Sequence, residues 1–525
     1  MTRLHSVKIL LRFFLFTLAA VLGTYRTTAQ TFTNLYNFSN SLSAVNGNPV
    51  AGVVVSGNML YGATYYGGTN GDGMIFALNT NGTGFATLHT FSPLVFSASA
   101  GGSTNSDGGN PVGLILSGNM LYGTTLSGGT NGSGTVFALS TNTNGNGFVS
   151  LHAFSTSSFD VNVLSSTNSD GAEPEAGLVS SGGTLYGTTY QAGTNGWGTV
   201  FAINTNGNGF TTLHSFNGGA TASATPSSDG GNPAATLVLN GNTLYGTTEA
   251  GGTNGWGTVF ALNTNGLGFI TLHSFSPYTF NAVTQTLSTN TDGATPKAGL
   301  VLSGNMLYGT TSAGGTNGTG MVFAVNTNGP TTTTVYDFSA TNGASFTNHD
   351  GANPLSVLVL SGNTLYGTTQ FGGTNGNGTI FAVNTDGTGF APLYNFNPVV
   401  ESSSLSYTNY GGANPKTGLV LSGNTFFGTA NGGGSYNRQS GDGGGLYGGG
   451  TVFALTVSMS VSPIPLNLQV NAPNLVLTWA NPAFFLQSAS GITGSWTTVP
   501  GASSPYNAAL TNPMQFFRLV DTNSP

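Results

Sequence analysis

Three carboxylates within six positions, Asp170, Glu173 and Glu175, form the densest group of ligating side chains in this sequence. Calcium in proteins takes about six to eight oxygen ligands, several of them from carboxylates, so this group is the candidate for a single calcium ion. Two neighbouring acids can also cleave a glycosidic bond together. Asp170 and Glu173 are the pair that a polysaccharide hydrolase or lyase would use.

Histidine and aspartate also recur at regular intervals, which invites a metal-site interpretation. The recurring residues are His89, His152, His214 and His273, and Asp107, Asp170, Asp229, Asp292 and Asp350. Tyrosine fills the histidine position elsewhere, at Tyr36, Tyr336 and Tyr394. We therefore expect a packed strand residue at that position. One aspartate per interval is too few for calcium, so each aspartate before its glycine is expected to cap the turn that leads into Asn-Pro and the next strand-like segment.

Two tryptophans lie in identical Thr-Asn-Gly-Trp-Gly segments, as Trp197 and Trp256. Small polar residues take the same place elsewhere, namely Asp72, Ser133, Thr319 and Asn377. The fold therefore does not require tryptophan there. An exposed indole beside an amide, here Asn195 and Asn254, suits a sugar ring through stacking and hydrogen bonds. The alternative is that each indole folds back and covers its own part of the fold.

Recognisable catalytic constellations are missing from the sequence. It contains no cysteine, no Gly-x-Ser-x-Gly segment and no His-Glu-x-x-His segment, so the usual signs of a nucleophile with its base are not found. We therefore predict no catalytic residues, and we expect a protein without chemistry of its own.

Charge is scarce throughout the 525 residues, with 8 lysines and arginines against 15 aspartates and glutamates. Four of the cations precede residue 30, so the rest of the chain carries four cations against fifteen acids, a net charge of −11. Nucleic-acid binding needs clustered cations, and this class of function is excluded. The 83 glycines, with abundant threonine and asparagine, are typical of strands and turns.

Residues 1–29 have the three parts of a secretory signal peptide. Arg3 and Lys8 precede an apolar stretch from Ile9 to Leu22, and Ala29 ends a plausible cleavage site. The alternative, a membrane anchor, normally needs about 20 apolar residues. We expect an exported protein, secreted or held at the cell surface, with no transmembrane segment in the mature chain.

A phrase close to Leu-Tyr-Gly-Thr-Thr occurs seven times, at spacings of 58 to 64 residues, and marks a tandem repeat. Its aromatic residues are Tyr61, Tyr122, Tyr186, Tyr245, Tyr308, Tyr366 and Phe427. Each repeat contains four strand-like segments, which we name A to D. In the second repeat they are residues 113–117, 121–125, 135–139 and 148–154. Asn-Gly and Ser-Gly-Asn turns separate them, which predicts a four-stranded antiparallel meander.

The two ends of the repeat array indicate a closed ring. The seventh repeat lacks segment D, whereas residues 32–38 match the D segment at 390–396. The N-terminal strand can therefore complete the last sheet and leave no open edge. The sequence predicts an all-β protein, a seven-bladed β-propeller of four-stranded blades. The alternative is an open solenoid.

The chain divides into four predicted parts. The signal peptide, residues 1–29, precedes the propeller, residues 30–456. Residues 457–465 form a linker, and residues 466–525 form a small β module that resembles a sandwich of five or six strands. In the propeller, the B–C and D–A connections share one face. Because the D–A loops vary in length and sequence, we expect binding on this B–C/D–A face.

The repeat resembles the bacterial choice-of-anchor tandem repeat GloVer-containing family. The matching segments are Asp229–Pro233, Leu244–Thr248, Gly251–Gly255 and Gly257–Ala261, with their sister copies over about residues 31–456. The resemblance implies an exported, surface-associated protein with a variable C-terminal module, and it implies no defined reaction.

These observations predict an exported, non-catalytic binding or surface-structural protein, with glycans or envelope components as candidate partners at the B–C/D–A face. Calcium is the one candidate cofactor. A polysaccharide hydrolase or lyase on the same scaffold is the first alternative, and a purely structural envelope protein is the second.

Overall fold

The computed structural model divides into two compact units, residues 1–457 and 458–525. It describes residues 30–38, 47–142, 147–218, 227–277, 289–329, 331–342, 345–398, 400–402, 406–437, 449–457, 467–471, 474–478, 484–489, 497–499, 502–509 and 516–521. The predicted signal peptide lies outside the described residues. Among the described residues there is no helix, and therefore none that could cross a membrane.

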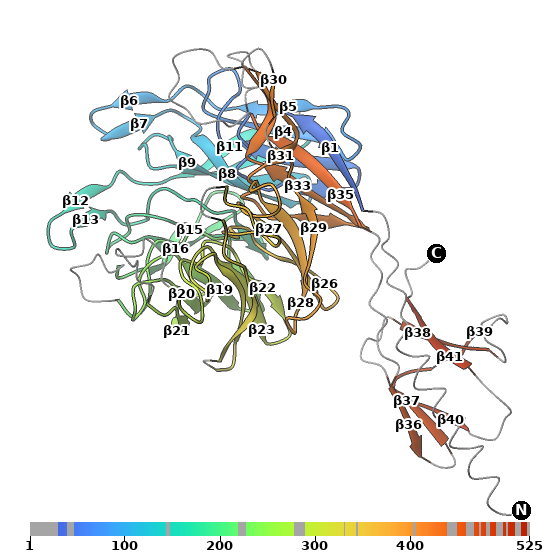
Figure 1. Ribbon diagram of the computed structural model, residues 1–525. Coiled ribbons are helices and arrows are strands. Elements are labelled where there is room, and N and C mark those ends of the chain that lie inside the picture. The colour runs from blue at the N-terminus through green and yellow to red at the C-terminus, as the bar shows by residue number, and fades with distance from the viewer. Residues whose placement is uncertain are drawn as a thin grey trace, which may run out of the picture. The chain divides into compact units, whose positions relative to one another are not determined.

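Seven four-stranded antiparallel sheets form a β-propeller in the first unit (Figure 1). Blade 1 comprises β2 (Val54–Ser56), β3 (Met59–Thr64), β4 (Met74–Asn79) and β5 (Ala86–Thr90), and blade 2 comprises β8 (Gly109–Ser117), β9 (Met120–Ser127), β10 (Thr135–Ser140) and β11 (Phe148–Ala153). Blade 3 comprises β14 (Val179–Ser181), β15 (Thr184–Thr189), β16 (Thr199–Asn204) and β17 (Thr211–Ser215), and blade 4 comprises β18 (Val238–Asn240), β19 (Thr243–Thr248), β20 (Thr258–Asn263) and β21 (Ile270–Ser274).

The remaining three blades follow the same order. Blade 5 comprises β22 (Val301–Ser303), β23 (Met306–Thr311), β24 (Met321–Asn326) and β25 (Thr332–Asp337), and blade 6 comprises β26 (Val359–Ser361), β27 (Thr364–Thr369), β28 (Thr379–Asn384) and β29 (Ala391–Asn395). Blade 7 comprises β32 (Val420–Ser422), β33 (Thr425–Ala430), β35 (Thr451–Thr456) and β1 (Thr31–Asn37). Strands A to D of each repeat are thus the four strands of one blade.

The N-terminal strand closes the ring, as predicted. Strand β1 pairs antiparallel with β35, from Thr31 opposite Thr456 to Asn37 opposite Thr451. Phe38, directly after β1, is fully buried in an apolar cluster that joins blade 7 to blade 1. The last sheet is therefore built from both ends of the repeat array, and the open solenoid is excluded.

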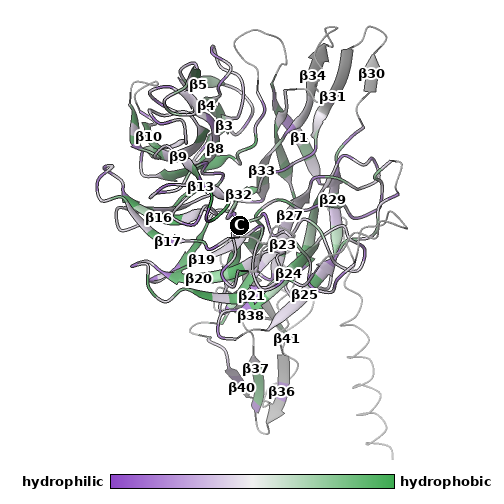
Figure 2. Cartoon of the chain, turned by 90° about the vertical axis from the view of Figure 1, so that its left-hand side faces the viewer, coloured by the Kyte–Doolittle hydropathy of each residue, from purple (hydrophilic) through white to green (hydrophobic). Residues whose placement is uncertain are grey.

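The core lies between the blades, where buried apolar side chains of neighbouring blades pack together. The strands of the blades carry many of the hydrophobic residues (Figure 2). The cluster around Phe154 of blade 2 and Phe201 of blade 3 is one example. Strand C is buried along almost its whole length in every blade. Its central phenylalanine is inaccessible to solvent in all seven copies. Each repeat thus buries two phenylalanine side chains, one in strand C and one directly after strand D. This burial explains why phenylalanine recurs at these two positions in every repeat of the sequence.

Some D–A connections carry strands of their own. Between blades 1 and 2 stands the hairpin of β6 (Val95–Ser97) and β7 (Gly102–Thr104), and between blades 2 and 3 that of β12 (Ser158–Asp160) and β13 (Ser165–Thr167). Beside blade 7, β30 (Val400–Ser402), β31 (Ser406–Ala413) and β34 (Gly432–Asn437) form a small sheet. The loops of the B–C/D–A face therefore differ from blade to blade, although the blades themselves share one architecture.

The second unit is a small β module of two three-stranded sheets. One contains β36 (Asn467–Asn471), β37 (Asn474–Thr478) and β40 (Tyr506–Ala509), and the other β39 (Thr497–Thr498), β38 (Phe484–Ala489) and β41 (Phe516–Asp521). Leu477 of one sheet and Leu486 of the other are fully buried in a single cluster. This is the sandwich-like arrangement that the alternating sequence predicted.

Candidate functional site

The recurring histidines and aspartates meet in pairs on the B–C/D–A face. Each histidine on strand D hydrogen-bonds through Nε2 to the carboxylate of the aspartate in the following D–A loop, at 2.9–3.1 Å. The pairs are His89 with Asp107, His152 with Asp170, His214 with Asp229 and His273 with Asp292. In blade 5 the hydroxyl of Tyr336 donates to Asp350 at 2.9 Å.

These aspartates also anchor their loops, but at the second residue after strand D rather than at the predicted turn into segment A. Asp170 accepts hydrogen bonds from the backbone N–H and the hydroxyl of Ser155, both at 3.1 Å. Burial would raise the pKa of Asp229, but hydrogen bonds from His214 and Ser227 bring that pKa below its usual value. The ionised carboxylate is thus the form that holds the loop.

The histidine rings are packed strand residues, as predicted. The ring of His89 stacks on Phe148 of the next blade, with centroids 4.0 Å apart, and Tyr336 stacks on Phe390 at 3.8 Å. Where the next blade supplies Thr332 instead of phenylalanine, its hydroxyl lies 2.8 Å from Nδ1 of His273. Each ring therefore ties one blade to the next.

Trp197 and Trp256 are half-buried and pack against the apolar clusters between blades. Trp197 lies with Phe216 and Leu237 between blades 3 and 4. The amides beside them are engaged too, because Asn195 donates to the Ser215 carbonyl at 3.1 Å and Asn254 to the Phe275 carbonyl at 3.1 Å. The four residues thus cover their blades, and their sugar-binding role stays a prediction.

The three clustered carboxylates separate into different environments. Asp170 is held by His152 at 2.9 Å, and Glu173 accepts a hydrogen bond from Gln191 at 2.8 Å. Glu175 instead lines a cavity. Within the described ranges, no group of three or more such side chains is arranged to hold a metal ion.

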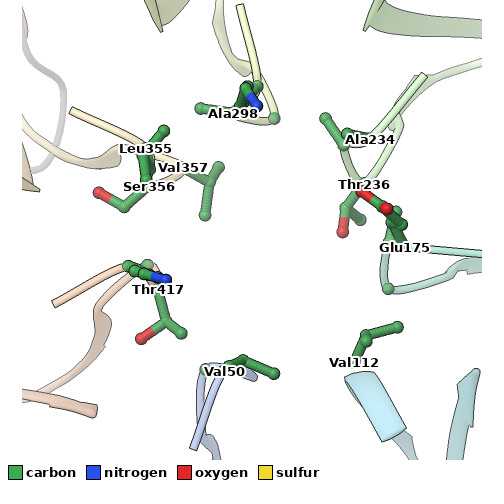
Figure 3. A pocket seen from close by; sticks show the side chains of 18 of the residues that line it. Val50, Val112, Glu175, Ala234, Thr236, Ala298, Leu355, Ser356, Val357 and Thr417 are labelled. Carbon is green, nitrogen blue, oxygen red and sulfur yellow. The ribbon is translucent and has the colours of Figure 1, made fainter. Parts of the chain in front are cut away.

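That cavity, about 250 Å³ in volume, lies where the strand A segments of all seven blades converge (Figure 3). Each blade contributes the residue that follows the proline at the start of segment A, and we call these seven residues the axial ring. They are Val50, Val112, Glu175, Ala234, Lys297, Leu355 and Lys416. Because the axial ring follows the D–A loops directly, it belongs to the B–C/D–A face.

Just after the axial ring, the backbones of neighbouring A segments approach each other closely. A Cβ atom on Gly113 of blade 2 would lie 2.5 Å from Cα of Gly177 in blade 3, so the two backbones touch without side chains between them. A Cβ atom on Gly299 would lie 2.9 Å from the carbonyl oxygen of Thr236. The cavity therefore narrows below the axial ring.

In six of the seven blades, the residue two positions before the axial ring has a left-handed backbone conformation. It is an asparagine in the left-handed region at Asn110, Asn232, Asn353 and Asn414, with φ of 54–57°. Asn232 donates from its side chain to the Tyr190 carbonyl of the preceding blade at 3.0 Å, which docks the turn. In blade 3, Glu173 takes this position at φ 54°. A left-handed glutamate is costly, and it stands beside the cavity.

The acids near the cavity interact with one another. Burial raises the pKa of Glu175 to about 7, with further increases from Glu249 and Glu173 and a decrease from Lys297. Lys297 pairs with Glu249 at 2.7 Å, and the Tyr190 hydroxyl donates to Glu249 at 3.1 Å. This is the densest concentration of charge that the described structure shows.

The sequence alone does not predict a site that contains Glu249, Lys297 and Lys416, because these residues belong to three different repeats. One signal was available. The residue after the proline varies between apolar, acidic and basic types from repeat to repeat, whereas the neighbouring positions keep their character. A comparison of the seven copies at that position would have singled out Glu175 together with the two lysines.

Exposed apolar side chains gather on the D–A connections. Phe96 in β6 is 72% exposed and Phe159 in β12 is 65% exposed, and Phe346 is exposed in the loop between blades 5 and 6. Both hairpins extend from the same side of the propeller (Figure 1). Binding is predicted from the sequence on this same face, but at the tryptophans rather than at these phenylalanines.

Solved structures similar to this chain are distant. The computationally designed Ika8 protein is 14% identical, with 84% of this chain and 96% of that chain covered and a TM-score of 0.39. The oligogalacturonate lyase of Vibrio parahaemolyticus is 9% identical, with 82% and 98% covered and a TM-score of 0.41. TolB of Acinetobacter baumannii is 12% identical, with 60% and 58% covered and a TM-score of 0.33.

No curated protein matches the chain significantly. The Gloeobacter/Verrucomicrobia repeat matches three times, over residues 19–224, 143–344 and 278–461. These overlapping matches span all seven blades, and repeat and propeller together fit a surface repeat protein. The chain belongs to the Gloeobacter/Verrucomicrobia repeat family.

Proposed function

We propose that this is an exported, non-catalytic binding protein that holds a surface polysaccharide on its B–C/D–A face. The observation that carries the proposal is the pair of hairpins that present Phe96 and Phe159 to solvent on neighbouring D–A loops. A large aromatic side chain is normally buried against other apolar groups, so its exposure indicates a binding partner. The C–H face of a sugar ring is a suitable partner.

The surroundings of the hairpins suit a neutral or weakly charged glycan. The chain is poor in charge and rich in threonine, asparagine and serine, which offer hydroxyl and amide hydrogen bonds. The two phenylalanines stand on loops that are adjacent in the ring, between blades 1 and 2 and between blades 2 and 3. An extended oligosaccharide can contact both.

A glycan array probed with the mature protein, with and without calcium, tests the proposal. We expect binding to a set of polysaccharides, and a loss of about tenfold or more when Phe96→Ala and Phe159→Ala are combined. Leu267→Ala is the matched control, because Leu267 is 67% exposed on a C–D turn of the opposite face. Trp197→Ala and Trp256→Ala test the sites named from sequence.

Failure to bind any glycan, or unchanged binding by the double phenylalanine variant, would contradict the proposal. The first result would favour a purely structural envelope protein. Loss of binding in the tryptophan variants alone would move the site to the B–C loops.

A hydrolase or lyase is a second candidate, and Glu175 favours it. A carboxylic acid with its pKa raised to about 7, beside the further carboxylates Glu173 and Glu249, can act as a general acid near neutral pH. Turnover of plant and algal polysaccharides that is lost in Glu175→Gln would support this candidate. Binding without turnover would exclude it for the glycans tested.

A further inference from the structure

The axial cavity concentrates charge that the rest of the chain lacks. Of the four cations after residue 29, two belong to the axial ring, Lys297 and Lys416. Of the four glutamates, three lie at or beside the cavity, Glu173, Glu175 and Glu249. The fold does not require charge at the axial ring, because four blades place valine, alanine or leucine there.

Most of these charges already have partners. Glu249 is paired with Lys297 at 2.7 Å and accepts the Tyr190 hydroxyl at 3.1 Å. Glu173 accepts from Gln191 at 2.8 Å. Two groups remain, since among the described residues Glu175 has no hydrogen-bond partner and Lys416 has no ion pair. One half-buried carboxyl group and one exposed ammonium group thus line the cavity without a hydrogen-bond or ion-pair partner among the described residues.

The two groups belong to opposite sides of the cavity. Glu175 starts segment A of blade 3 and Lys416 starts that of blade 7, which are three blades apart in a ring of seven. Figure 3 shows Glu175 and Thr417, the neighbour of Lys416, across the cavity from each other. A ligand that satisfies both groups must carry its charges at separate ends.

The charge distribution sets the direction of such a ligand. On the Glu175 side, three carboxyl groups outnumber the single Lys297, which favours a cationic end there. Lys416, by contrast, forms no ion pair with a carboxylate of the described residues, which favours an anionic end there. The volume of about 250 Å³ is below the ~300–1,000 Å³ of sites for drug-sized ligands, so the ligand is small.

We propose that the axial cavity binds a small zwitterion with its ammonium and carboxylate at opposite ends, such as a dipeptide or an ω-amino acid. The ammonium contacts the carboxylate of Glu175, and the carboxylate contacts the ammonium of Lys416. The valine, alanine and leucine residues of the axial ring contact the apolar middle of the ligand. This site is separate from the hairpin phenylalanines and does not depend on glycan binding.

Isothermal titration of the mature protein with matched small probes tests the proposal. The probes are glycylglycine and 6-aminohexanoate, with glycine, hexylamine and hexanoate as comparisons that lack the separation or one of the charges. We expect 6-aminohexanoate or glycylglycine to bind at least about tenfold more tightly than each comparison. Weaker binding of the two extended zwitterions than of hexanoate would indicate a plain anion site and overturn the proposal.

Variants test whether the ligand binds at Glu175 and Lys416, and a control variant tests whether the loss of any surface charge would have the same effect. Glu175→Gln and Lys416→Gln should each weaken binding of the best probe by about tenfold, whereas Lys416→Arg should retain most of it. Asp386→Asn removes one negative charge from an exposed C–D turn on the opposite face and should leave binding unchanged. No binding by any probe at about 10 mM, or equal binding by wild type and Glu175→Gln, would overturn the proposal.

Discussion

Two positions of the repeat behave in opposite ways. On strand D, every blade carries histidine or tyrosine, and in five described blades this ring bonds to an aspartate of the next loop. In the axial ring, by contrast, the residue is apolar in four blades and charged in three. Repetition marks a contact that most blades use for assembly. Departure from repetition marks a place that the scaffold leaves free for a ligand.

The largest expected effect comes from removing an element of the repeating scaffold. Deletion of residues 31–38 removes β1 and the buried Phe38, exposes the edge of β35 and opens the ring. We expect aggregation in size-exclusion chromatography and loss of the cooperative thermal transition. A monomeric deletion variant with the melting temperature of the intact protein would show that closure does not stabilise the ring.

A smaller effect is expected from one repeating contact. Asp170→Ala leaves the His152 ring and the Ser155 N–H without their acceptor, which should cost about 1–3 kcal/mol and lower the melting temperature. Lys416→Ala in the axial ring is the control and should change stability by less than about 0.5 kcal/mol. Equal losses in both variants, measured by differential scanning calorimetry, would remove the contrast between the two positions.

The smallest expected effect concerns pH. The pKa of Glu175 is raised from 4.5 to about 7 in the folded protein, so between these pH values the folded state holds a proton that the unfolded state has released. Stability should therefore fall as pH rises through this window. Melting temperatures of wild type and Glu175→Gln at pH 5 and pH 8 check this, and the variant should show the shallower decline.

Several neighbouring groups affect the pKa of Glu175, and the comparison of pH slopes must separate Glu175 from them. Glu249 and Glu173 raise its pKa and Lys297 lowers it, while Tyr65 and Tyr190 interact with the same carboxylates. All other titrating groups are common to wild type and Glu175→Gln, so the difference between the two proteins isolates Glu175. Identical pH slopes would mean that its carboxyl group is not desolvated by the fold.

Local sequence determined the blades and their number. Short stretches of sequence specify the strands and turns, namely the Leu-Tyr-Gly-Thr-Thr phrase, the apolar segment C and the glycine turns. Six of the seven blades then form from strands that follow one another in the sequence. Even closure was readable, because residues 32–38 carry the D pattern that the seventh repeat lacks. The contact of Asp170 is also local, since its partner Ser155 lies 15 residues away in the same loop, although it holds the start of the loop rather than the predicted turn into segment A.

Tertiary structure alone decided which side chains share a site. Glu175, Lys297 and Lys416 are far apart in sequence and meet because the ring brings the starts of seven A strands to one axis. It also turned Trp197 onto the core between blades 3 and 4 and left Phe96 in water. Contacts within a blade follow from neighbouring residues, whereas contacts across the axis follow from closure, which no single repeat encodes.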